Sequence, residues 1–231
     1  LNEENLVNAR PDLIISQDIC EVCSAHTDHV KRAVDILEKK PDVYTMNPHN
    51  IDEILKSIEE ISNKIGREKE GASLVDSLRK RVGFVKDQIF KKMPRVAAIE
   101  WIDPFFTSGH WVPEMIEIAG GKNLISSEKM PSRKMQLEEI RDADPDVIVI
   151  MPCGFDVKRT VDEYNKVLAE NQEWNDLRAV KENSVYVVDA NSYFSKPSLR
   201  TVTGIEILAS IFHPEIFKGL ELPENSYMKI N

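Results

Sequence analysis

Short aliphatic runs alternate along the chain with longer stretches in which apolar residues recur every three or four positions. The runs have the length of buried strands, and the longer stretches have the period of amphipathic helices. Strand and helix signals alternate, which predicts an α/β fold with a mostly parallel sheet. The predicted strands are Leu13–Ser16, Val43–Met46, Arg95–Trp101, Val147–Met151 and Val185–Val188.

Two consecutive helices are predicted before the third strand. Asn50 followed by Glu53 forms a capping box, an isoleucine-rich stripe runs on to Ile65, and Gly66 ends the helix. The same apolar period continues over 68–92, where a helix would be about 37 Å long. No Gly/Ser-rich or Pro-rich linker occurs nearby, so this second helix is interpreted as a rigid spine.

One phrase occurs twice, once at Glu4–Ile15 and once at Glu138–Val149. Each copy reads as a helix end, a Pro-Asp stop and a buried strand, which predicts two similar lobes with a ligand cleft between them. The expected division is an N-terminal lobe over 1–67, a spanning helix over 68–92 and a C-terminal lobe over 93–231. Only two strands precede the spine, so we expect the N-terminal lobe to be incomplete.

Charge and composition exclude some function classes. The 231 residues carry 30 basic and 39 acidic side chains, a net charge of −9, which argues against a nucleic-acid partner. No apolar run approaches the roughly 18 residues that cross a bilayer. The chain begins with Leu1, so a signal segment or lipid anchor is expected upstream of it.

Ligands of parallel sheets collect at the carboxyl ends of the strands. The residues at and after those ends are rich in aromatic side chains and poor in charge, which suits a bulky organic ligand. The candidate ligand-binding residues are Gln17, Cys20, Trp101, Phe105, Phe106, His110, Trp111, Cys153, Phe155, Tyr193 and Phe194.

Metal and catalytic chemistry are both disfavoured. Cys20, Cys23, His26 and His29 have a spacing close to that of zinc ligands, but on a helix the outer two would lie about 13 Å apart. No nucleophile elbow, phosphate-binding loop or His-Glu-x-x-His motif occurs. A nucleophile and base pair of Cys153 and His110 is the remaining enzymatic alternative. We expect a binding protein without a metal site, a cofactor or catalytic residues.

Five segments together resemble the substrate-binding proteins of ABC importers for vitamin B12, haem and iron-siderophores, and most closely the cobalamin-binding members. They are the stretches at 10–15, 104–109, 118–124, 144–149 and 174–188. The resemblance covers essentially the whole chain. It implies two Rossmann-like α/β lobes joined by a long rigid helix, the class III arrangement, with the ligand between the lobes and an extracytoplasmic location.

The resemblance also assigns roles to single positions. Glu4 takes the place of the glutamate that docks the N-terminal lobe on the membrane permease, whereas Ser195 and Lys196 stand at the corresponding place of the C-terminal lobe. Tyr193 takes the place of an aromatic ligand contact, and Gln17 stands where cobalamin binders can carry Trp. Members of the family begin with roughly sixty further residues. The edge of an incomplete N-terminal sheet is expected to be able to pair with a second copy as a homodimer.

The expected function is capture of a corrinoid such as cobalamin and its delivery to an ABC permease. A ferric siderophore is anionic and wants an Arg/Lys-lined cleft, but Lys158 and Lys196 are the obvious cations near the candidate loops. Three alternatives stay open: a ferric-siderophore or haem binder of the same family, an intracellular metal- or corrinoid-handling protein or enzyme, and an interaction module with an empty cleft.

Overall fold

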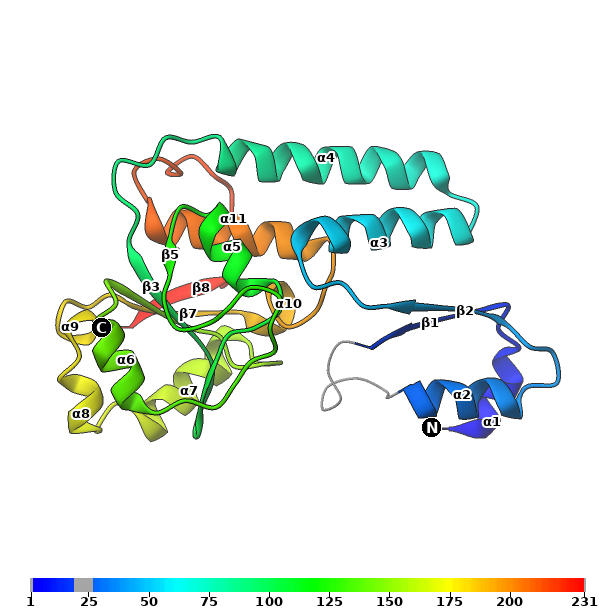
Figure 1. The fold of residues 1–231 in the computed structure, drawn as a ribbon, viewed down its shortest axis with the longest axis horizontal. Helices are drawn as coiled ribbons and strands as arrows, with labels where there is room; N and C mark the ends of the chain where they lie inside the picture. The colour runs from blue at the N-terminus through cyan, green and yellow to red at the C-terminus, as the bar shows by residue number, and fades with distance from the viewer. Residues whose placement is uncertain (1, 19–26, 231) are drawn as a thin grey trace.

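The computed structural model describes residues 2–18 and 27–230, and in 27–29 the backbone only. Its N-lobe begins with a two-stranded parallel sheet flanked by two helices, at the right of Figure 1. Leu13 of the first strand pairs with Asp42 of the second, and Gln17 pairs with Met46. The four elements are α1 (Glu3–Ala9), β1 (Leu13–Gln17), α2 (Thr27–Ile36) and β2 (Asp42–Met46).

The next helix begins and ends where the sequence predicts. In α3 (Ile51–Lys64) the Asn50 side chain accepts a hydrogen bond from the Glu53 amide at 2.8 Å. Glu53 accepts in return from the backbone of His49 at 2.7 Å, one residue before the expected partner. Gly66 has a φ of +68°, the left-handed conformation that ends a helix most readily at glycine.

Helix α4 (Glu68–Lys86) is shorter than predicted, since it ends six residues before Lys92. At 19 residues it is about 28 Å long. Beyond the end of the helix, Phe90 stacks on His213 of the C-lobe, with ring centroids 4.2 Å apart. Helix α4 runs antiparallel to α3, and its C-terminal end lies over α11 (Arg200–Phe212) of the C-lobe (Figure 1).

The C-lobe is built on a six-stranded sheet. The five predicted strands, two in the N-lobe and three in this sheet, are present within one residue at each end. Three short strands at the edges of this sheet were not predicted. The order is β4-β3-β6-β7-β8, with β5 also paired to β3; β3, β5, β6 and β7 are parallel, and β4 and β8 antiparallel. The strands are β3 (Arg95–Ile102), β4 (Phe105–Thr107), β5 (Lys122–Asn123), β6 (Val147–Ile150), β7 (Val185–Val188) and β8 (Tyr227–Ile230).

Helices cover both faces of this sheet. Side chains of β3 alternate between two cores: Val96 and Ala98 belong to one, and Ala97 and Ile99 to the other. The helices with side chains in the first core are α5 (Val112–Ile118), α10 (Ala190–Tyr193) and α11 (Arg200–Phe212). Those of the second core are α6 (Leu137–Ala143), α7 (Val157–Val167), α8 (Gln172–Asn175) and α9 (Arg178–Lys181).

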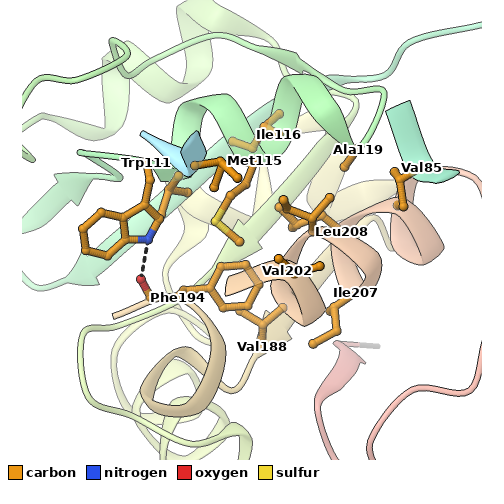
Figure 2. Packing of buried hydrophobic residues seen from close by; sticks show 14 of the residues in the cluster. Val85, Trp111, Met115, Ile116, Ala119, Val188, Phe194, Val202, Ile207 and Leu208 are labelled. Carbon is orange, nitrogen blue, oxygen red and sulfur yellow. Dashed lines mark hydrogen bonds between the residues drawn. The ribbon is translucent and has the colours of Figure 1, made fainter. Parts of the chain in front are cut away.

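The first core also holds α3 and α4. Ile54 and Leu55 of α3 and Val75 and Val85 of α4 are buried in the same cluster as the C-lobe residues. Figure 2 shows the C-lobe part, where Met115 and Phe194 pack beside Val202 and Leu208. The division at 67 and 92 stays a prediction, but this shared core joins the two helices firmly to the C-lobe.

Candidate ligand-binding site

A cavity of about 510 Å³ lies at the carboxyl ends of strands from both lobes. Gln17, the last residue of β1, comes from the N-lobe, and the end of β1 faces the C-lobe in Figure 1. The volume is within the range of small-molecule sites. The lining residues are Gln17, Glu100, Trp101, Pro104, Phe106, Gly109, His110, Trp111, Val112, Ser132, Met151, Cys153, Phe194 and Ser195.

The segment from β3 to α5 supplies most of this wall. Strand β4 folds back on β3, and the register shifts between Ile99, which pairs with Thr107, and Trp101, which pairs with Phe106. Glu100 is therefore the extra residue of a β-bulge, a feature that re-aims a side chain. The loop after β4 continues through His110, whose φ is +56°, into α5.

A second segment holds that loop in place. The His110 amide donates to the carbonyl of Met130 at 2.7 Å, and the Ser108 and Ser126 hydroxyls lie 3.1 Å apart. A Cβ on Gly109 would lie 2.3 Å from the Ser132 nitrogen, so only glycine fits without moving this backbone. The loop is fixed before any ligand binds, which reduces the ordering entropy of binding.

Aromatic rings form the apolar part of the cavity. Trp111 is 4% exposed, and its Nε1 donates to the carbonyl of Phe194 at 3.0 Å, the bond drawn in Figure 2. Trp101 donates from Nε1 to the carbonyl of Asp103 at 3.1 Å and packs edge to face against Phe155. Both indole N–H groups are thus satisfied within the protein, so neither needs a polar partner from a ligand.

Two ionisable groups of the lining have shifted pKa values. Burial raises the pKa of Glu100 to about 7, against a smaller opposing effect of the Gly109 N–H. Burial, and then the neighbouring His49, lower the pKa of His110. The lining, taken over the described residues, contains no lysine or arginine. The site is therefore apolar, with one carboxyl group that sits near its titration point at neutral pH.

The structure brings together most of the predicted site residues in this lining: Gln17, Trp101, Phe106, His110, Trp111, Cys153 and Phe194. The other three that it describes point elsewhere. Phe105 stacks on Trp174 in the second core at 6.0 Å, and Tyr193 packs in the first core. Phe155 is buried between Trp101 and Arg159. Cys20 lies outside the described residues. Ligand contact by any of these residues stays a prediction.

Sequence reasoning missed Glu100, which lies within a predicted strand rather than after it. A signal was present, because an acid inside an otherwise apolar buried strand is unfavourable unless a partner or a function retains it. Met151 was predicted as the end of a strand and not as part of the lining. Ser195 lines the cavity as well, and its hydroxyl accepts a hydrogen bond from the Gly154 amide at 3.0 Å.

Most of the cysteine and histidine residues with zinc-like spacing lie outside the residues that the structure describes. Cys20, Cys23 and His26 are not described, and of His29 only the backbone is. Within residues 2–18 and 27–230, no group of three or more His, Cys, Asp or Glu side chains is placed to hold a metal ion. In the same ranges, no helix is long and apolar enough to cross a membrane.

Residues 1–192 match the model of a family described as periplasmic binding protein. The chain belongs to this family. The match confirms the resemblance drawn from the sequence and the α/β fold class, and it agrees with a binding protein rather than an enzyme.

The named relatives do not agree on one ligand. An uncharacterized ABC transporter substrate-binding lipoprotein of Bacillus subtilis, YvrC, is 28% identical over 227 residues, 94% of this chain and 67% of its own length. The haem uptake protein IsdE of Staphylococcus aureus is 25% identical over 138 residues, which are 57% of this chain and 46% of IsdE. The vitamin B12 binding protein BtuF of Vibrio cholerae has a TM-score of 0.68 at 20% identity, covering 95% of this chain and 80% of BtuF. That likeness establishes the fold alone, and the fold does not choose the ligand.

Proposed function

We propose that this chain is the substrate-binding component of an ABC importer. It captures a bulky, largely uncharged metal chelate of the corrinoid type in the cavity between its lobes and delivers it to a membrane permease. The location consistent with this role is extracytoplasmic. YvrC, which aligns over nearly the whole chain, is described as a substrate-binding lipoprotein of an ABC transporter.

The residues that line the cavity support the choice of a corrinoid. The partly exposed rings of Trp101 and Phe106 line the cavity, backed by the buried Trp111 and Phe194. The described lining has no lysine or arginine to neutralise an anion. Haem and many ferric siderophores carry acidic groups, which favour guanidinium or ammonium partners. Corrinoids carry neutral amide side chains around a large ring, so they suit these walls better.

Haem is the second candidate, on a single observation. The relative that aligns over 138 residues, IsdE, is described as part of a high-affinity haem uptake system. Its alignment omits two fifths of this chain, so it does not outweigh the absence of cations from the described lining.

Titration of the full chain with cyanocobalamin, haemin and a ferric siderophore tests the proposal. Trp101 and Trp111 line the cavity, so quenching of tryptophan fluorescence reports binding there, and calorimetry gives the stoichiometry. We expect saturable binding of cyanocobalamin at one site. Binding of none of the three contradicts the proposed function, and binding of haemin alone replaces the corrinoid with haem.

Two neighbouring phenylalanines provide a matched pair of variants. Phe106 lines the cavity, whereas Phe105 points to the opposite core and stacks on Trp174. Phe106→Ala should weaken cyanocobalamin binding about tenfold, because a buried aromatic contact contributes about 1.4 kcal/mol. Phe105→Ala should lower stability and leave the dissociation constant unchanged. Equal effects of both variants on binding would place the ligand elsewhere.

Docking on the permease is proposed for the exposed face of α1. Glu4 lies in the first turn of that helix and is exposed. On the C-lobe, Lys196 donates to the side chain of Asn191, so this surface offers a cation where the family resemblance implies an acid. Glu4→Gln should reduce transport in a reconstituted importer without changing ligand affinity, and Glu3→Gln on the same turn is the control.

Pairing of two copies through the N-lobe sheet stays a prediction. Ile15 of β1 is 47% exposed and Val43 of β2 is 36% exposed, so apolar surface is available. Light scattering of the purified chain tests this directly. A monomer at all concentrations contradicts the pairing.

A further inference from the structure

Among the described residues that line the cavity, Glu100 is the one with a carboxyl group. Capture of a bulky, largely uncharged ligand does not by itself require an acid there. It lies in β3 between Ile99, which is fully buried, and Trp101, which lines the cavity. An acid in such a strand lowers stability unless it is used. Its position on the bulge turns it away from the regular alternation of the strand and toward the cavity.

The surroundings of Glu100 hold it without neutralising it. Its backbone carbonyl accepts from the Cys153 amide at 3.2 Å, which ties the bulge to the end of β6. The Gly109 N–H is the group that favours the charged form of its carboxyl. No basic side chain of the described ranges is among the groups that shift the pKa of Glu100, and the described lining contains no lysine or arginine. A carboxylate accepts more hydrogen bonds than a single amide provides.

We propose that Glu100 is a specificity-determining residue that accepts a hydrogen bond from an N–H donor of the ligand, such as the carboxamide of a corrinoid side chain. The inference rests on the proposed function and deepens it. Glu100 would favour an amide-bearing ligand at this end of the cavity. It would disfavour a carboxylate-bearing ligand of similar size, because two carboxylates would then face each other in an apolar site.

Protonation gives the proposal a measurable signature. A donor ligand prefers the charged carboxylate, so binding should strengthen as pH rises through about 7 and should release a proton near that pH. A carboxylate ligand at the same place prefers the protonated form, so its binding should weaken over the same range. Other titratable groups around the cavity are His110 and Cys153 on the lining, with His49 beside His110.

The Glu100→Gln variant removes the charge and keeps the size, so the other titratable groups are common to both proteins. The dissociation constant of cyanocobalamin for the full chain is measured at pH 5.5 and 8.5. We expect a loss of about tenfold at pH 8.5 and little change at pH 5.5, since charged acceptors bind donors more strongly than neutral ones. Glu138→Gln on the exposed surface of α6 is the matched control and should behave as wild type.

Calorimetry in two buffers of different ionisation enthalpy gives a second readout on the wild-type chain alone. It should show about half a proton released on binding at pH 7, and none for the variant. Equal affinity of both proteins at pH 8.5, or no proton release, overturns the inference and leaves the proposed function standing. Saturable binding of haemin, which bears carboxylates, with no weakening above pH 7 also overturns it. Failure of the wild type to bind any of the three probes refutes the proposed function itself.

Discussion

Strands β1 and β6 begin in the same way and lie in different surroundings. Each follows a short helix that is capped by a left-handed residue, Arg10 at φ +45° and Asp144 at φ +41°, and each starts after a Pro-Asp pair. Yet Ile148 of β6 is fully buried under helices on both faces, and Ile14 at the same place of β1 is only partly buried.

The difference shows what a repeated local sequence motif determines. It specifies the helix end, the turn and the strand, because these depend on sterics of the residue before proline and on aliphatic side chains. It does not specify how much apolar surface the strand buries, which depends on the neighbouring strands. Strand β6 lies between two strands, whereas β1 has β2 on one side. Four predictions test whether burial is what separates such pairs of positions.

The largest effect is expected from removing the same side chain in both copies. Ile148→Ala leaves a cavity in a closed core and should lower the free energy of unfolding by about 4 kcal/mol. Ile14→Ala should lower it by about 1 kcal/mol, because part of the side chain already contacts water. Urea unfolding followed by circular dichroism measures both. Equal losses would mean that β1 is as well packed as β6.

The second prediction concerns the carboxyl ends of the two sheets, where β1 ends in neutral Gln17 and β3 carries Glu100. The pKa of Glu100 is raised from 4.5 to about 7 by burial, so its contribution to stability is full below pH 4.5 and is lost as pH rises through 7. Glu100→Gln should therefore stabilise the ligand-free chain by about 3 kcal/mol at pH 8.5. Little difference is expected at pH 4.5.

The measurement is the free energy of unfolding of both proteins at the two pH values. A gain of the same size at both would assign the effect to shape rather than to charge. Together with the expected loss of cyanocobalamin affinity, a pH-dependent gain would show that the well-packed sheet keeps an unfavourable group for the sake of binding.

Much of the fold follows from the sequence for a physical reason. The five predicted strands are continuous aliphatic runs, which the buried middle of a sheet requires. Strands β4, β5 and β8 have two to four residues and lie at edges, where no pattern is imposed. The end of α4 was placed too late because Ile89 continues the helical period, whereas the contact of Phe90 with His213 is tertiary.

The candidate site was predictable in location and less so in detail. Residues after strands indicated the aromatic wall, but Phe105 and Phe106 are adjacent and point to opposite sides. Only the pairing register, Phe106 with Trp101, decides which one lines the cavity. Glu100 depends on a bulge, and a bulge changes the side-chain direction by an irregularity of pairing that the sequence does not encode locally.

The third prediction compares two ion pairs made by neighbouring positions of α4, one with the C-lobe and one with α3. Toward the C-lobe, Arg81 donates from Nε to Glu206 at 2.8 Å, and the Glu206 side chain is only 9% exposed. Arg81→Met would leave that carboxylate without its partner and should cost about 2 kcal/mol of stability. Arg79 pairs with Glu59 of α3 at 3.7 Å in a largely exposed setting, so Arg79→Met should change stability by less than about 0.5 kcal/mol. A comparable loss of stability in both variants would show that the two ion pairs do not differ through their exposure to solvent.

The smallest expected effect comes from the repeated aspartate. Asp146 accepts from the Arg95 amide at 2.9 Å and pairs with Arg178 at 3.1 Å, whereas Asp12 pairs with the exposed Lys39. Burial opposes ionisation of Asp146, but these partners outweigh it and lower its pKa. Asp146→Asn should lose about 1 kcal/mol at pH 7, and the loss should disappear as pH falls through the lowered pKa.

Asp12→Asn is the control at the matching position of the other lobe. Its side chain is 84% exposed, so we expect no measurable change in the unfolding midpoint at any pH between 4 and 8. A loss in Asp12→Asn equal to that in Asp146→Asn would have one explanation. The aspartate after the proline would act through the turn that both copies share, and the burial of the sheet behind it would not matter.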